Sequence, residues 1–363
     1  MIYLDNAATT FVKPPSVMRA MNEYMFLLGG NPGRGGHFLS LRAGDAVYKC
    51  REVLANLIGA SPEEIVLMPS ATMALNTAIK GVLKPNDHAI ITCFEHNSVL
   101  RPVHKTCAYS VCTSPENALS LVHPETKMLI VNHASNVNGV IADLEGYKKA
   151  AHDAGLLLLV DASQTAGHLP LSVSGIDMLA AAGHKGLFGP QGTGFLYVRK
   201  GLKLNSLIEG GTGFMSESYT QPDLMPEALE SGTLNGVGFA GLAEGAAFAA
   251  KQLNSGITEN LNRALKQGLA AIPKVHLLSP VFENTAPAVA FTVENTDSVA
   301  FSDFMSEKHK ICVRSGLHCA PLAHKTLGTV KTGAVRASLS YFNTLTEVEK
   351  FLNIIDMTPS FSV

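Results

Sequence analysis

The chain has 363 residues, of which 46% are hydrophobic and only 16% are charged. This length exceeds one ordinary domain, so it predicts two. The low share of charged residues leaves surface that can be buried between subunits, which favours a homo-oligomer. The formal net charge of -2 and the lack of a basic run argue against a nucleic-acid-binding surface.

Six cysteines stand at irregular spacings, and no two of them form a CxxC pair, so we expect no zinc or other metal site. The longest apolar runs are too short to cross a bilayer, and we expect no membrane partner. Without a recognisable signal peptide, the sequence predicts a cytoplasmic protein with reduced thiols. Five cysteines are expected to be inert core residues: Cys50, Cys93, Cys107, Cys112 and Cys312.

Short apolar runs alternate with helical stretches over the first two hundred residues. The runs are rich in Leu, Ile and Val on both faces, which is typical of parallel strands covered by helices. Strands are predicted at 64–68, 88–94, 128–132, 156–161 and 192–198, and helices at 71–83, 98–108 and 144–154.

The pattern changes after about Gly210. A helix rich in Gly and Ala is predicted at 239–253, then a strand at 289–293 and a helix at 302–309. We therefore expect a second, smaller α/β domain in this part of the chain.

Lys185 and Asp161 are the most informative pair. Lys185 ends the run at 180–185, and Asp161 ends an apolar strand. A lysine that can form a Schiff base, with a carboxylate on a nearby strand end, is what pyridoxal phosphate (PLP) needs from a protein. Taken singly, the lysine could be a surface charge and the aspartate a helix cap.

Two more strand ends carry polar residues. The strand at 64–68 runs into Ser70, Ala71 and Thr72, where free N–H groups and a hydroxyl at a helix start suit a phosphate. Simple capping of that helix is the alternative. His96 follows the next strand, where it either meets a flat ring, moves protons or caps the following helix.

The strand at 128–132 adds amide groups at the same edge through Asn132 and Asn136, while His133 is expected to be structural. Gln164 follows Asp161 by three residues. The glycine-rich loop at 189–194 has no helix after it, so it is expected to be a turn rather than a nucleotide-binding loop.

A late loop carries the thiol of Cys319. Gly316 and Pro321 indicate that this loop is exposed, and His318 and Arg314 are expected to favour the thiolate. Cys319 is therefore a candidate nucleophile, with an inert thiol as the alternative.

Arg336 stands in a strand-like context at 335–339. A buried arginine needs an anionic partner and would suit a bidentate carboxylate. A surface position on an edge strand is the alternative.

From the segment YLDNAATT at 3–10 to the segment YFNT at 341–344, the chain resembles the cysteine desulfurase branch of the class V aminotransferases. The most specific segments are that opening, VDASQ at 160–164, GHK at 183–185 and RSGLHC at 314–319. The short cysteine loop resembles the Suf-type members, which often pass sulfur to a separate protein.

The resemblance implies fold type I of the PLP-dependent transferases. This is an α/β fold with a mostly parallel central sheet and helices on both faces in a large domain, expected at 12–250. A smaller α/β C-terminal domain is expected at 251–363, and residues 1–11 are expected to pack near the active site.

The resemblance also implies roles around the PLP ring. Lys185 would bond to the cofactor and shuttle protons at Cα, and Asp161 would pair with the ring nitrogen. Gln164 would touch the phenolic oxygen. His96 would stack on the ring and manage the proton of the substrate thiol.

For the phosphate, the resemblance implies Ala71, Thr72 and His184, joined by Thr233 from the neighbouring subunit of a homodimer. The family often has a hydroxyl two residues before this histidine. Here that position is Ala182, so one hydrogen bond is missing or is supplied elsewhere.

For the substrate, the resemblance implies Arg336 and Asn136 on the carboxylate, with Arg314 as a second arginine. L-cysteine would become L-alanine, and its sulfur would stay as a persulfide on Cys319 for an acceptor protein or small thiol, for example in iron–sulfur cluster assembly. One alternative is a selenocysteine lyase, or another β-eliminating or transaminating PLP enzyme. Another is a scaffold of the same fold without catalysis.

Overall fold

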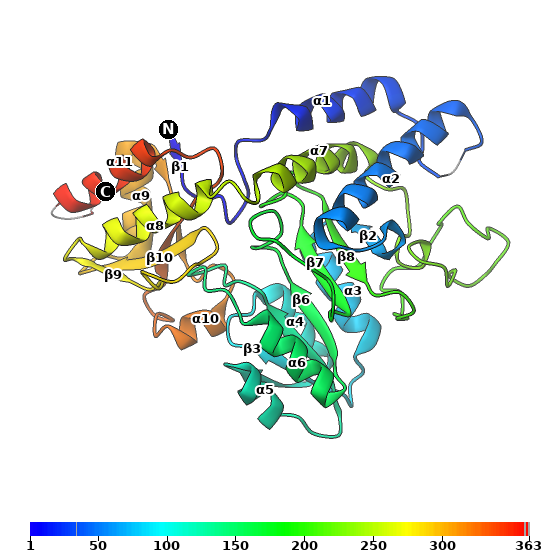
Figure 1. The fold of residues 1–363 in the computed structure, drawn as a ribbon, viewed down its shortest axis with the longest axis horizontal. Coiled ribbons are helices and arrows are strands. Elements are labelled where there is room, and N and C mark those ends of the chain that lie inside the picture. Colours follow the sequence, from blue (N-terminus) through cyan, green and yellow to red (C-terminus); the bar gives the residue numbers. More distant parts are fainter. Residues whose placement is uncertain (34, 359–360, 362–363) are drawn as a thin grey trace.

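The computed structural model describes residues 1–33, 35–358 and 361. A seven-stranded sheet forms the centre of the larger part of the molecule (Figure 1). Its strands, in spatial order, are β2 (Ile65–Met68), β8 (Gly194–Val198), β7 (Met178–Ala182), β6 (Leu157–Asp161), β5 (Thr126–Asn132), β3 (His88–Thr92) and β4 (Ala108–Cys112). Only the two pairings that involve β8 are antiparallel. The predicted, mostly parallel sheet is confirmed.

Helices cover both faces of this sheet, as predicted. They are α2 (Phe38–Ile58), α3 (Ala71–Val82), α4 (Asn97–Thr106), α5 (Pro115–Ser120), α6 (Leu144–Ala154) and α7 (Gly236–Gln252), and α1 (Pro15–Glu23) packs on the outside of α7. Successive residues of β6 face opposite sides, as the pleat requires. Leu158 and Val160 pack with residues of α2, α5, α6 and α7, and Leu159 packs with residues of α3 and α4. Three short turns accompany them: η1 (Tyr24–Leu28), η2 (Pro62–Glu64) and η3 (Glu227–Leu229).

A second, four-stranded sheet belongs to the C-terminal part of the chain. Its strands are antiparallel and lie in the order β12 (Arg314–Gly316), β13 (Ala334–Ser338), β10 (Ala288–Val293) and β9 (Val275–Leu277). The helices of this part are α8 (Ile257–Ala270), α9 (Ser298–His309), α10 (Pro321–Thr326) and α11 (Leu345–Met357). Its core also takes in Ile2 and Leu4 from the start of the chain. The division at residue 250 stays a prediction.

Some predicted elements end elsewhere. The helix expected at 98–108 stops at Thr106, because Cys107 is extended and the chain goes directly into β4. The helix expected at 302–309 starts at Ser298, because the side chain of Asp297 accepts hydrogen bonds from the first free N–H groups. The loop at 189–194 is irregular, with a bend at 191–192 before β8, and no helix follows it, as expected.

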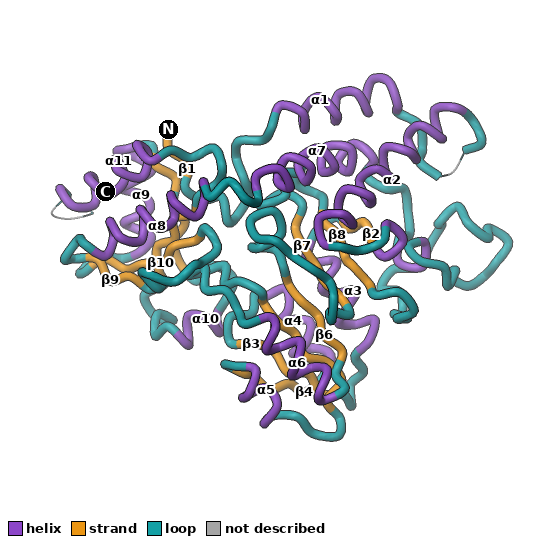
Figure 2. Tube along the Cα trace, in the orientation of Figure 1, coloured by secondary structure: helices purple, strands orange, loops and turns teal. Residues whose placement is uncertain are grey.

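The N-terminal segment connects the two parts of the molecule. Strand β1 (Ile2–Tyr3) pairs with β11 (Ile311–Cys312) of the small domain, and the chain then crosses to α1 on the large domain (Figure 1). At the opposite end of the molecule, the connection at 199–226 has no helix or strand and projects as a long loop (Figure 2). Segment 3–10 therefore lies between the domains, where a site can be shared by both.

Candidate active site

One cavity lies where the carboxyl ends of the parallel strands meet the small domain. Asn132, Asp161 and Ala182 end β5, β6 and β7 and line it, and strands β12 and β13 contribute Arg314 and Arg336. Ligands of open α/β sheets bind at this edge. Apart from Thr233, every site residue predicted from the sequence lines this cavity.

Lys185 follows β7 by three residues in a tight turn. A Cβ at Gly183 would clash with the hydroxyl of Thr193, and one at Gly186 with the carbonyl of Ala166. Burial lowers the pKa of Lys185 to about 8, although the negative charge of Asp161 favours the ammonium form. The neutral amine, which is the nucleophilic form, is therefore a far larger fraction of this lysine near neutral pH than of an ordinary lysine, although the ammonium form still predominates.

The peptide between His184 and Lys185 is held by the N-terminal segment. The carbonyl of His184 accepts hydrogen bonds from the backbone N–H of Thr10 at 3.1 Å and from the Nζ of Lys13 at 3.1 Å. The hydroxyls of Thr9 and Thr10 lie 3.2 Å from the same oxygen. These contacts fix the backbone from which the Lys185 side chain enters the cavity.

Asp161 is buried at the end of β6, next to Asn132 of β5. Its Oδ1 accepts a hydrogen bond from the N–H of Ser163 at 2.9 Å. Gln164 donates from Nε2 to the carbonyl of Ala7 at 3.1 Å, which attaches the N-terminal segment to the wall of the cavity. The carboxylate, the amide and Lys185 therefore share one space.

His96 lines the cavity and also caps α4, so the capping is confirmed, and its role at a flat ring or in proton transfer stays a prediction. Its Nδ1 accepts a hydrogen bond from the backbone N–H of Ser98 at 3.1 Å. Burial, followed by the charge of Lys185, lowers the pKa of His96 to about 4. The ring is therefore neutral, and because Nδ1 is an acceptor, the proton is assigned to Nε2.

The start of α3 forms the opposite wall of the cavity. The hydroxyl of Ser70 caps the helix by accepting from the N–H of Met73, which leaves the N–H and side chain of Thr72 to the cavity. The imidazole of His184 lies nearby, and burial lowers its pKa to about 4. Capping of α3 is therefore done by Ser70, and the binding of an anion by Thr72 and His184 stays a prediction.

Thr233 is the one predicted site residue that does not line this cavity. Within its own chain it lines a different cavity, together with Met68, Leu207 and Ile208. Its expected approach to the phosphate from a neighbouring subunit stays a prediction.

Arg336 is buried in the middle of the small sheet, which excludes a surface position on an edge strand. Strand β13 lies between β12 and β10, and the residue is 1% exposed. Its Nη2 donates to the Oδ1 of Asp5 at 2.7 Å, and its Nη1 donates to the carbonyl of Asn136 at 2.8 Å. Its Nε has no partner among the described residues.

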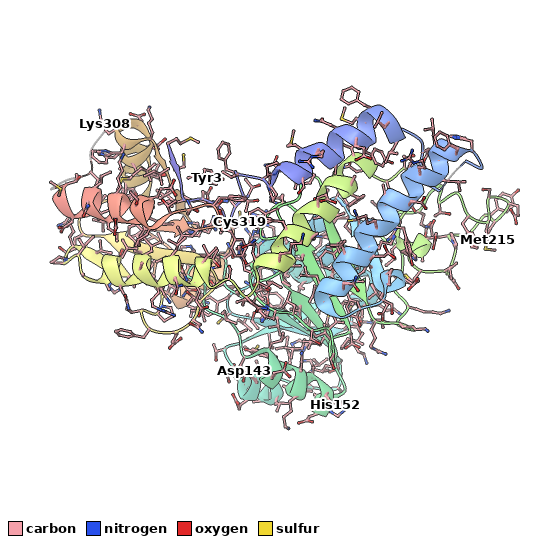
Figure 3. The ribbon with its side chains drawn as sticks, turned by 45° about the horizontal axis from the view of Figure 1, so that its top comes forward. Tyr3, Asp143, His152, Met215, Lys308 and Cys319 are labelled. Carbon is pink, nitrogen blue, oxygen red and sulfur yellow. The ribbon has the colours of Figure 1, made fainter. Side chains whose placement is uncertain are left out.

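Cys319 is exposed and lies between the two domains (Figure 3). Its φ of 56° is in the left-handed region, as is the φ of 51° at His318. Two donors hold this strained turn: Asn136 Nδ2 donates to the carbonyl of His318 at 2.7 Å, and the N–H of Asn97 donates to the carbonyl of Cys319 at 2.8 Å. The guanidinium Nη2 of Arg314 lies 3.9 Å from the Cys319 sulfur.

The expectation that His318 favours the thiolate is wrong. Burial, followed by the positive charge of Arg336, lowers the pKa of His318 to about 2, so the ring carries no charge. The His318 Nε2 lies 3.4 Å from the carbonyl of Arg314, and its Nδ1 lies 3.2 Å from the Nε2 of His324. The side chain supports the loop from inside the protein, and the positive groups near the Cys319 sulfur are Arg314 and Lys185.

The comparisons with known proteins agree with this geometry. Residues 2–351 of this chain match the family described as aminotransferase class-V. The chain belongs to this family. A probable cysteine desulfurase of Methanothermobacter thermautotrophicus is 33% identical over 96% of this chain and 92% of its own length. A probable cysteine desulfurase of Pyrococcus abyssi is 32% identical over 98% of this chain and 94% of its own length. The apo structure of a cysteine desulfurase from Thermococcus onnurineus has a TM-score of 0.89 at 32% identity and covers 98% of this chain and 94% of that one.

Class V aminotransferases use PLP, and the residues of this cavity fit that group. Four of its lining residues carry a buried polar atom without a hydrogen-bond partner in the described structure: Asn136 Oδ1, Ser163 Oγ, His184 Nδ1 and Arg336 Nε. Buried polar groups are nearly always paired, so this concentration indicates a polar ligand. An amine, a carboxylate and helix-start N–H groups are in place for the aldehyde, the ring nitrogen and the phosphate of PLP.

Sequence reasoning missed three residues. Ser98 and Ser163 line the cavity two positions after His96 and Asp161, a spacing that could have marked them. Glu95, the neighbour of His96 in the chain, is fully buried beside Thr92 and Asn132, and burial raises the pKa of its carboxyl to about 8. Among the described residues, no group of three or more His, Cys, Asp or Glu side chains could hold a metal ion. None of the described helices is long and apolar enough to span a membrane.

Proposed function

We propose that the protein is a PLP-dependent cysteine desulfurase that converts L-cysteine to L-alanine and keeps the sulfur as a persulfide on Cys319. The observation that carries this proposal is one cavity lined by an amine of lowered pKa, an exposed thiol and a buried arginine: Lys185, Cys319 and Arg336. The family relationship and the names of the relatives support it.

Arg336 binds the carboxylate of the substrate. Its Nε is free, and its Nη1 and Nη2 are held in place by Asn136 and Asp5. Asn136 has its amide nitrogen on the His318 carbonyl, so it acts on the carboxylate through Arg336 and the loop. A fixed guanidinium orients the substrate and saves the entropy of a bimolecular encounter.

Lys185 moves the protons at Cα. PLP, when bound, supplies an aldehyde that takes an amine and a protonated ring that draws electrons from the substrate. Lys185 takes the Cα proton in its neutral form and returns it as an ammonium group. Asp161 would keep the ring nitrogen of bound PLP charged, and the Nε2–H of the neutral His96 can donate a hydrogen bond to the substrate sulfur.

Cys319 accepts the sulfur. Its thiolate, with the charge of Arg314 beside it, attacks the sulfur of the substrate as the bond from that sulfur to Cβ breaks. L-cysteine and the Cys319 thiol are consumed, and L-alanine and a Cys319 persulfide are formed. Atoms and electrons balance without an external oxidant or reductant.

The proposal also includes a homodimer of this chain. A homodimer would bring Thr233 of one subunit to the phosphate held by the other. The long loop at 199–226 supports this, because Phe214, Met215 and Tyr219 expose large apolar surfaces on it. Cys319 is open to an acceptor protein or thiol, for which iron–sulfur cluster assembly is one use, and its free thiol suits the cytoplasm.

Alanine release tests the proposal. Wild type, Cys319→Ser and the matched control Cys312→Ser are each given cysteine or selenocysteine. We expect wild type and the control to release alanine from cysteine and Cys319→Ser to lose nearly all of that rate. Full release from either substrate without Cys319 would instead indicate a selenocysteine lyase or another β-eliminating enzyme.

A further inference from the structure

The hydroxyl of Ser98 stands between two groups of the cavity. It lies 2.8 Å from the Oγ1 of Thr72 at the start of α3 and 2.9 Å from the Nδ1 of His96, which caps α4. Ser98 itself lines the cavity. It therefore connects the proposed phosphate side of the site with the ring side.

This hydroxyl can turn away from His96 without leaving the ring unpaired. The Nδ1 of His96 also accepts from the backbone N–H of Ser98 at 3.1 Å, and that donor is fixed by the helix. The O–H group is thus a spare donor, in contrast to the Ser70 hydroxyl, which is needed to cap α3. The Ser98 hydroxyl can therefore donate to a ligand while the Nδ1 of His96 keeps a hydrogen-bond partner.

The surroundings of Ser98 favour an anion. Helices α3 and α4 both begin at this part of the cavity, and the positive ends of their dipoles lie there. Asp161 is the only carboxylate among the described residues that line the cavity, and it lies at the end of β6. His184, with its unpartnered buried Nδ1, adds a second polar group that needs a partner.

The last side chain of strand β7 offers no hydrogen-bond donor to the proposed phosphate. Ala182 ends β7 with a methyl group in the cavity wall, and its neighbour Gly194 lies against the start of α3. A dianionic phosphate can accept more hydrogen bonds than the N–H groups at the start of α3, the Thr72 hydroxyl and His184 can donate. The side chain that is positioned to add a donor is Ser98.

We infer that Ser98 binds the phosphate of the cofactor directly, through a hydroxyl that turns from His96 to the phosphate when the ligand enters. This rests on the proposed function, because it assumes that PLP occupies the cavity. It adds a phosphate ligand from α4 to those expected from α3 and from His184.

Cofactor affinity tests this inference. Ser98→Ala and the control Thr106→Ala, which removes a hydroxyl at the other end of α4, are titrated with PLP and with pyridoxal, and binding is followed by visible absorption. We expect Ser98→Ala to weaken PLP about tenfold or more, the range for a hydrogen bond to a charged group, and to leave pyridoxal unchanged. Thr106→Ala should match wild type for both ligands.

An unchanged PLP affinity in Ser98→Ala would overturn the inference, and so would an equal loss for PLP and pyridoxal, which would place Ser98 on the ring side only. A second readout is the thermal stabilisation of the cofactor-free protein by inorganic phosphate, which should be smaller in Ser98→Ala. If wild type binds neither PLP nor pyridoxal, the proposed function itself fails. If wild type binds PLP and the variant binds it equally well, only the role of Ser98 fails.

Discussion

The ion pair between Asp5 and Arg336 gives the sharpest prediction about stability. The Arg336 side chain is 2% exposed and the Asp5 side chain 22%, and their charged atoms are 2.7 Å apart. Asp5→Asn keeps the size of the side chain and removes the charge. Breaking a buried pair by removing one partner costs about 3–5 kcal/mol, because the other charge stays buried alone. The partial exposure of Asp5 places the expected loss near the lower value, about 3 kcal/mol.

Urea unfolding followed by circular dichroism measures this loss. The control is Glu259→Gln, whose partner Arg263 lies 3.9 Å away with both side chains more than half exposed. We expect that control to stay within about 0.5 kcal/mol of wild type. If Asp5→Asn is as stable as the control, Arg336 does not depend on Asp5, and our account of how the arginine is held is refuted.

Three further predictions concern the groups around the cavity. Burial raises the pKa of Glu95 to about 8, so this carboxyl contributes a loss of stability of roughly 1.4 kcal/mol per pH unit as the pH rises from about 4.5 to about 8. In urea unfolding, the difference in stability between wild type and Glu95→Gln should change with pH by that amount, and a difference that stays constant would disprove the assignment. Gly186→Ala meets a backbone carbonyl and should cost about 1–3 kcal/mol, whereas Gly36→Ala, in open space, should be neutral by the same assay. Asn136→Ala removes the donor to the buried carbonyl of His318, so hydrogen exchange across the Cys319 loop should become faster; equal exchange would contradict this contact.

Much of the site was predictable because parallel strands end at one edge of a sheet. Asp161 and Lys185 follow neighbouring strands, and His96 follows a third, so the strand pattern alone brings them together. The same pattern predicted helices on both faces, since the apolar residues of each strand point both ways. These inferences need only local periodicity and the order of the elements.

The partners of the small domain were not predictable in this way. Asp5 reaches Arg336 across 331 positions of the sequence, because an isolated bridge pairs Asp5 with Ser338 of β13, and the sequence pattern gives no sign of this bridge. His318 was misjudged because the loop around it looks exposed, whereas its ring turns inward to His324. Local composition marks a turn, but it does not say which of its side chains enter the core.

The account depends most directly on the fate of the substrate sulfur. The purified protein is incubated with L-cysteine, its thiols are alkylated, and its peptides are weighed by mass spectrometry. We predict one added sulfur atom on the peptide that contains Cys319, formed in step with L-alanine. Alanine formed while that peptide stays unmodified, or sulfur found on another cysteine instead, would contradict the account.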